Sequence, residues 1–123
     1  MRVKIKPLDR LFSEYIRKRA MGRVGGCERC LASKSDYRQL QCSHYHSRRK
    51  ASTRFNEDNA VGLCAGCHLY LGGHPLEHTE WYRKKIGEER FTLLEIQAAQ
   101  IVKPDQTVVK LYLEQKLKEV LNG

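Results

Sequence analysis

Two pairs of cysteines have the spacing of metal-binding turns: Cys27 with Cys30, and Cys64 with Cys67. Two intervening residues let each pair present two sulfur atoms from one tight turn, and four thiolates satisfy a tetrahedral zinc ion. The pattern predicts a structural zinc site, because four thiolates leave no open position for catalysis. A redox-active Cys-x-x-Cys motif and buried apolar cysteines are the alternatives. Cys42 has no partner at this spacing, so we expect it to be buried in a hairpin.

A second set of polar residues, His44, Asn59 and His68, has an order that could serve phosphodiester cleavage. That reaction needs a base to deprotonate water, a cation to neutralise the phosphate, and a group that holds the base in place. A neutral histidine is a suitable base, a second histidine can bind a divalent ion, and an asparagine amide can fix the loop beside them. Taken singly, a histidine of this kind is more often a packed or surface residue than a metal ligand.

The cysteines and the histidines together form a known pattern. The chain resembles the HNH (ββα-metal) endonuclease superfamily in one ordered set of residues: Cys27-x-x-Cys30, Ser43-His44-Tyr45, Asn59 and Cys64-x-x-Cys67-His68. His44 and Asn59 are 15 residues apart and Asn59 and His68 are 9 apart, as the motif requires. Over roughly residues 27–96 the chain is similar to the phage NinG (Rap) recombination nucleases, in these segments: Ser43-His44-Tyr45, Thr53-Arg54-Phe55-Asn56-Glu57-Asp58-Asn59, the Cys64 pair and Gly73-His74.

This resemblance implies a fold and a set of roles. The fold would be α+β, with a small treble-clef, ββα-metal core at residues 25–74, a structural zinc site of four cysteines, and flanking N-terminal and C-terminal helices. His44 matches the general base, Asn59 the residue that orders the loop, and His68 a ligand of a catalytic Mg²⁺ or Mn²⁺. Cleavage would leave 5′-phosphate and 3′-hydroxyl ends. The substrates would be branched recombination intermediates of a phage or prophage, such as D-loops and Holliday junctions.

One position departs from the superfamily pattern. The residue before the base is usually an Asp or His that binds the catalytic metal, whereas Ser43 is a poor ligand when neutral. The NinG-like proteins also carry a small residue there. We expect His74 to help complete the metal shell, with His46, Asp58 and substrate oxygens as the alternatives.

The formal net charge of +9 comes from the N-terminal half of the chain. Residues 1–58 contain 15 Lys and Arg against 6 Asp and Glu, whereas residues 59–123 contain 8 of each. Such a surface suits a polyanion. Four basic residues close to His44 are predicted to contact DNA phosphates: Arg48, Arg49, Lys50 and Arg54. The run Arg17-Lys18-Arg19 either extends this surface or packs on the core.

Hydrophobic periodicity and helix-ending residues predict the secondary structure. We expect helices over residues 8–21, 75–86, 93–102 and 106–121, one or two helical turns between Cys67 and Gly72-Gly73, and strands around residues 37–42 and 60–63. Gly22 should end the first helix, and Thr92 should start the fourth through a capping box with Glu95. A chain of 123 residues has room for one domain, made of a basic helix (1–24), the core (25–74) and a helical region (75–123).

The sequence leaves several functions open. A metal-dependent DNA endonuclease is the first, and a homodimer through the C-terminal helices would suit branched substrates. The main alternative is a non-catalytic zinc-ribbon or treble-clef DNA-binding protein, and a zinc-bearing protein-interaction module is the third. Because no secretory signal and no run of 18 apolar residues is present, we expect the protein in the bacterial cytoplasm.

Overall fold

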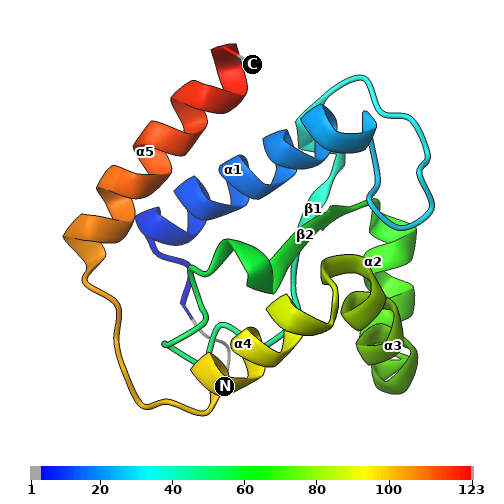
Figure 1. The fold of residues 1–123 in the computed structure, drawn as a ribbon. Coiled ribbons are helices and arrows are strands. Elements are labelled where there is room, and N and C mark those ends of the chain that lie inside the picture. Colours follow the sequence, from blue (N-terminus) through cyan, green and yellow to red (C-terminus); the bar gives the residue numbers. More distant parts are fainter. Residues whose placement is uncertain (1–3, 123) are drawn as a thin grey trace.

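The computed structural model describes residues 4–122, and helices surround a short hairpin (Figure 1). The elements, in chain order, are α1 (Pro7–Val24), the 3₁₀ turn η1 (Tyr37–Gln39), β1 (Gln41–His44), the 3₁₀ turn η2 (Glu57–Asn59), β2 (Ala60–Leu63), α2 (Ala65–Gly72), α3 (Pro75–Ile86), α4 (Glu88–Ala98) and α5 (Gln106–Asn122). The described chain therefore has the mixed α+β architecture that the sequence predicts.

α1 begins where a proline and a capping carboxylate coincide. Pro7 lies in the first turn, and the Asp9 carboxylate accepts a hydrogen bond of 2.8 Å from the Lys6 amide. The predicted end at Gly22 is wrong, because the helix runs past this residue, which has no neighbour within 4 Å of an added Cβ. The helix ends at Gly25, whose φ of 67° lies in the left-handed region that favours glycine.

β1 and β2 form an antiparallel hairpin in which Gln41 pairs with Leu63 and His44 pairs with Ala60. The second strand agrees with the prediction, whereas the first begins later than predicted. Residues 37–39 instead form η1, which begins with a hydrogen bond from the Arg38 amide to the Asp36 carboxylate. This polar capping contact takes the segment out of the strand before the hairpin starts.

α1 covers one face of the hairpin. A Cβ added at Gly62 of β2 would lie 2.7 Å from the Ala20 Cβ of α1, closer than side chains tolerate. The glycine therefore lets the helix approach the sheet closely. Every residue of β2 is buried, because α1 packs on one face and the helices after the hairpin pack on the opposite face.

The helices after the hairpin agree only partly with prediction. α2 begins directly after Cys64, and α3 has the predicted bounds. The predicted helix over residues 93–102 is wrong at both ends, since α4 starts one turn before Thr92 and ends at Ala98. Phe91, which precedes the predicted cap, is buried in the core and needs to lie inside the helix. Tertiary packing therefore overrides the local capping signal.

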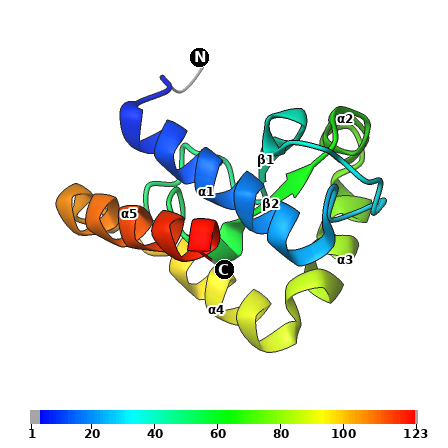
Figure 2. The ribbon, with the colours of Figure 1, turned by 90° about the horizontal axis from the view of Figure 1, so that it is seen from above.

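Two hydrophobic clusters lie on either side of the hairpin. The first packs the hairpin, the end of α1 and the first cysteine turn against α2, α3 and α4 through these buried residues: Ala20, Cys27, Leu40, Val61, Leu63, Cys67, Leu71, Tyr82, Phe91 and Leu94. The second joins α1, β2 and α5 through Phe12, Tyr15, Ile16, Ala60, Leu113 and Leu117. Figures 1 and 2 both show α5 beside α1, so the last helix completes the core around the first.

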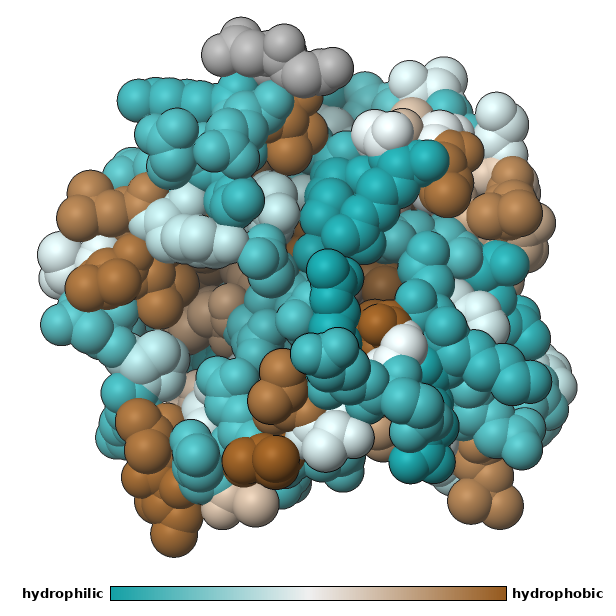
Figure 3. All heavy atoms as spheres, viewed as in Figure 1, coloured by the Kyte–Doolittle hydropathy of each residue, from teal (hydrophilic) through white to brown (hydrophobic). Residues whose placement is uncertain are grey.

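α5 buries only one side of its apolar surface. Leu113 is 1% exposed against α1, whereas Val108 and Leu111 are each 62% exposed. On the face seen in Figure 3, hydrophobic side chains gather along α5 and along the segment that precedes it. From the sequence, this apolar stripe could belong either to the core or to a dimer surface. In the structure, the side of the stripe that faces α1 belongs to the core.

Candidate functional site

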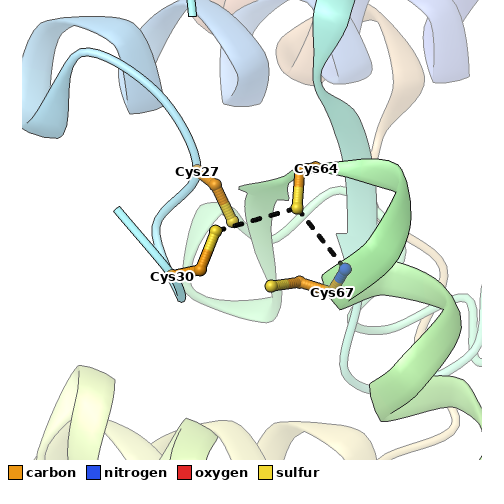
Figure 4. Close-up of side chains that lie close together, drawn as sticks. All are labelled: Cys27, Cys30, Cys64 and Cys67. Atoms are coloured by element: carbon orange, nitrogen blue, oxygen red, sulfur yellow. Dashed lines mark hydrogen bonds between the residues drawn. The ribbon is translucent and has the colours of Figure 1, made fainter. Parts of the chain in front are cut away.

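The four predicted zinc ligands lie together (Figure 4). The sulfur atoms of Cys27, Cys30, Cys64 and Cys67 all lie within 4.8 Å of one another, and the sulfurs of Cys30 and Cys64 are 3.8 Å apart. Zinc–sulfur bonds of about 2.3 Å in a tetrahedron place the sulfurs roughly 3.8 Å apart. The four cysteines could therefore hold a structural zinc ion, in agreement with the prediction from their spacing.

The first cysteine turn is shaped by its own backbone and anchored to the sheet. The Leu31 amide donates to the Cys27 carbonyl at 3.0 Å, and Leu31 itself adopts a left-handed φ of 64°. Glu28, in the same turn, is 3% exposed and accepts a hydrogen bond of 2.8 Å from the Gly62 amide. This contact holds the turn on β2, just ahead of the second cysteine pair.

The charges around the cluster suit a metal ion. Burial raises the pKa of Cys27, but hydrogen bonds from the backbone of Cys64, Cys30 and Arg29 outweigh it and lower the pKa to about 6. Burial raises the pKa of Cys67 to about 12, although Arg29 donates to its sulfur at 3.4 Å. A bound metal ion would supply the positive charge that allows all four sulfurs to be thiolates together.

Asn59 fixes the turn that follows β1. Its side chain is fully buried, its Oδ1 accepts from the His46 amide at 2.8 Å, and its Nδ2 donates to the His46 carbonyl at 3.0 Å. Its own carbonyl accepts from the Tyr45 amide at 2.8 Å. Asn59 therefore clamps both backbone groups of His46 in the turn after β1.

His44 ends β1 on the face covered by α1. Its ring lies 5.5 Å from the Phe12 ring, and its Nε2 is buried with no hydrogen-bond partner among residues 4–122. Burial lowers the pKa of His44 to about 4, although a hydrogen bond with the Arg54 backbone opposes the shift. His44 is therefore neutral at physiological pH. Cys42, expected to be buried in the hairpin, is partly buried on the same face.

A cavity of about 490 Å³ opens beside His44 and Cys42. Its opposite wall is α1, which contributes Arg10 and Arg17, and the loop after β1 contributes Arg48. Sequence reasoning did not assign Arg10 or Arg17 to this site. The available signal is their spacing of seven residues, which places both on one face of the first helix, beside its apolar stripe.

The four basic residues predicted to bind DNA have different surroundings. Arg54 is 13% exposed and binds the buried Asp9 carboxylate through two nitrogens, at 2.9 and 2.6 Å. Arg48 lies 3.7 Å from the same carboxylate. Arg49 and Lys50 are exposed on the loop, where they line a separate pocket of about 370 Å³. Arg54 therefore ties the loop to α1, whereas Arg49 and Lys50 lie at the surface.

His68 lies on α2, on the opposite side of the hairpin from His44. Its Nδ1 is 2.6 Å from Gln41 Oε1, and both residues line an open pocket of about 670 Å³. Side chains alternate along a strand, so Gln41 and His44 point to opposite faces of β1. Burial lowers the pKa of His68. The structure therefore places the expected base and the expected metal ligand in different cavities.

The other two candidate histidine ligands also have partners of their own. His46 Nε2 is 2.6 Å from Glu95 Oε1, and the His74 ring stacks at 4.0 Å on the Tyr70 ring. Ser43 is 2% exposed, and the Asp58 carbonyl accepts a hydrogen bond from the Tyr82 hydroxyl. Within the described part of the chain, the four cysteines form the one group of three or more side chains that could hold a metal. The predicted ligands of a catalytic metal are not members of that group.

Comparison with known proteins gives a family for the chain. No helix among residues 4–122 has the length and apolar character needed to cross a membrane. No curated protein and no solved structure matched the sequence. A family described as the bacteriophage lambda NinG protein matches residues 2–122, which is almost the whole sequence. The chain therefore belongs to the bacteriophage lambda NinG family.

Proposed function

We propose that the protein is a DNA endonuclease that hydrolyses phosphodiester bonds with His44 as its general base. The observation that supports this proposal is the position of His44, a neutral imidazole at the end of β1 that lines a cavity with arginines from two elements. The turn after the strand is clamped by Asn59. The chain order of β1, β2 and α2 supports the proposal of a ββα-metal core.

In the proposed reaction His44 takes a proton from the attacking water, whose oxygen bonds to phosphorus while the bond between phosphorus and the 3′ oxygen breaks. The departing 3′ oxygen takes a proton from solvent to give the 3′-hydroxyl, and the 5′-phosphate stays on the other product. The atom proposed for this role is Nε2, which has no partner among the described residues; because it is buried, the side chains that cover it must move before water reaches it. An anionic phosphate in the adjacent cavity would raise the pKa of His44, bringing the base closer to the pH at which proton transfer is efficient. The arginines of the cavity would stabilise the negative charge that develops on the phosphate oxygens.

HNH chemistry normally includes a divalent ion such as Mg²⁺ or Mn²⁺, which neutralises charge on the phosphate and on the leaving oxygen. The predicted ligands His68, His74 and His46 do not converge on His44, and each contacts another group. The residues present therefore do not fit the expected metal shell, and the proposed proton transfer does not depend on it. Added metal is an experimental variable in the test below.

The family name suggests the biological setting. Because the family is that of a phage protein, we propose that the chain acts in the cytoplasm of an infected or lysogenic bacterium, on DNA recombination intermediates. Branched DNA such as a Holliday junction would need two active sites, so a homodimer fits this proposal. The exposed apolar residues of α5 are the surface to examine for such a contact.

The test is cleavage of labelled duplex, single-stranded, three-way and four-way junction DNA by the wild type, His44→Ala and Arg83→Ala. Arg83 lies on α3, 51% exposed and paired with Glu88, so its variant controls for handling and folding. We expect cleavage by the wild type and Arg83→Ala, and none by His44→Ala. Each protein is assayed with Mg²⁺, with Mn²⁺ and with EDTA at a concentration that spares tightly bound zinc. Cleavage by His44→Ala at the wild-type rate would contradict the assignment.

One observation favours a second function, that of a non-catalytic zinc-containing DNA-binding protein. The His44 Nε2 is buried, and the candidate ligands of a catalytic metal lie apart. Such a protein would bind all four DNAs, with a strong salt dependence, but would cut none with either metal. A protein-interaction module would bind DNA weakly and with little salt dependence.

A further inference from the structure

The three consecutive basic residues of α1 have three different environments. Arg19 is 9% exposed and donates to the carbonyls of Glu57 and Ala60, at 2.9 and 2.7 Å. Lys18 pairs with Glu14 at 3.1 Å. Arg17 instead lines the cavity that contains His44. The run thus both packs on the core and extends the basic surface, and Arg17 is the member that faces the site.

Arg10 lies seven residues before Arg17 and lines the same cavity. A helix rises about 1.5 Å per residue, so the two backbone positions are roughly 10 Å apart along one face of α1. The side chain of Arg10 forms no hydrogen bond or ion pair with another residue of the described chain. Its charge is therefore available to a ligand in the cavity.

Arg17 is held in place without losing its capacity to bind an anion. Its Nε donates to the Ser13 carbonyl at 3.1 Å, and its guanidinium lies 5.1 Å from the centre of the Tyr37 ring. Both contacts restrain the side chain, while its two terminal nitrogens remain as donors. A restrained guanidinium loses less conformational entropy when it binds a phosphate.

The acidic residues of the cavity wall do not cancel these charges. Asp9 is already bound by Arg54 at 2.6 Å, and Glu14 is bound by Lys18. Burial opposes ionisation of Asp9, but the Arg54 hydrogen bond, the Lys6 amide and the charges of Arg54 and Arg48 together lower its pKa. Each carboxylate therefore has its own cation, and the charges of Arg10 and Arg17 are left in excess.

We propose that α1 forms a phosphate-binding subsite in which Arg10 and Arg17 hold the DNA backbone on either side of the phosphate that faces His44. This inference rests on the proposed function for the identity of the polyanion. It adds that the first helix is one wall of the site. DNA would pass between α1 and the loop after β1, with its backbone along the arginine face of the helix.

The test measures binding of a fluorescent DNA duplex to the wild type, Arg10→Ala, Arg17→Ala, the double variant and Arg83→Ala, over a range of salt concentrations and without divalent metal. Each phosphate contact that is lost should reduce the slope of log K against log salt by about one. At the lowest salt concentration we expect about ten-fold weaker binding for each single variant. Arg17→Lys should keep most of the slope, since it keeps the charge, and circular dichroism reports whether each variant is folded.

The outcomes separate this inference from the proposed function. If the double variant loses about two units of slope while Arg83→Ala keeps the wild-type slope, the subsite stands, whether or not the wild type cleaves DNA. If the wild type cleaves DNA but the folded double variant binds with wild-type affinity and slope, the subsite is refuted and the nuclease proposal survives. Equal losses of binding affinity in Arg10→Ala, Arg17→Ala and Arg83→Ala would also refute the subsite. They would mean that binding depends on the net charge of the protein and not on the position of the arginines.

Discussion

The ion pair between Asp9 and Arg54 should make a measurable contribution to stability. It joins the first turn of α1 to the loop after β1, residues that are 45 positions apart. The side chains are 7% and 13% exposed, and two charge-assisted hydrogen bonds of 2.9 and 2.6 Å connect them. We expect replacement of either residue by alanine to destabilise the protein. Asp9→Ala leaves the nearly buried Arg54 without its carboxylate, and Arg54→Ala leaves Asp9 with Arg48, 3.7 Å away, as its remaining cation.

The size of the effect follows from the burial of the pair. Exposed ion pairs contribute about 0–1 kcal/mol, whereas removing one partner of a fully buried pair costs about 3–5 kcal/mol. With both side chains slightly exposed, we expect a loss of about 2–3 kcal/mol for Asp9→Ala or Arg54→Ala. The double variant should lose little more than either single variant, because the pair is removed as a unit.

The pair also predicts a pH dependence. The pKa of Asp9 in the folded protein lies below its ordinary value of 3.8. Its stabilising contribution is therefore complete above that value and is lost as the pH falls through the lower, folded-state pKa. Wild-type stability should fall more steeply than that of Asp9→Asn as the pH drops below about 4. The asparagine can still accept the Lys6 amide, which isolates the loss of charge from the loss of the helix cap.

The measurement is urea denaturation of the wild type, both single variants and the double variant, with zinc bound throughout. Coupling energies near zero, with the two single losses adding in the double variant, would refute the reasoning. A pH profile for Asp9→Asn that runs parallel to the wild type would refute the assignment of the ionised carboxylate.

Three further predictions concern the metal cluster, the clamp and the core. Cys67→Ser should lose bound zinc, which atomic absorption measures. The loss of zinc should cost on the order of 10 kcal/mol of metal-coupled folding energy. A zinc-free variant that is stably folded would contradict this prediction. Asn59→Ala leaves both backbone groups of His46 without partners and should cost about 2–4 kcal/mol in urea denaturation; a loss below about 0.5 kcal/mol would exclude the clamp. Leu113→Ala should cost about 2–4 kcal/mol while Leu111→Ala on the same helix costs little, and equal losses would mean that α5 packs differently.

Features encoded by neighbouring residues could be predicted from the sequence. The two Cys-x-x-Cys pairs specify a thiol cluster, and the structure places their sulfurs together. The bounds of α3 follow from Pro75 at its start and Gly87 after its end. In each case a short sequence pattern is enough for the prediction, because residues within one or two turns of the chain determine the local structure.

Features that depend on distant residues could not be predicted in this way. The polar spacing of Thr92 and Glu95 suggested a helix start, but burial of Phe91 extends α4 toward its N-terminus. Arg54 looks like a phosphate ligand in sequence, because nothing local indicates that Asp9 of α1 will neutralise it. The same long-range packing brings Arg10 to His44. Both contacts exist because α1 packs against the hairpin. That packing depends on residues throughout the core.

The packing of α5 against α1 has a consequence for how the protein is made. α1 leaves the ribosome before α5, but its buried face, with Phe12, Tyr15 and Ile16, is covered partly by Leu113 and Leu117 of α5. At about 5–20 residues added per second, that face waits several seconds for its partner helix. During this interval the nascent chain exposes an apolar helix beside a strongly basic surface. Chaperones can bind the apolar face and nucleic acid the basic surface before α5 packs on α1.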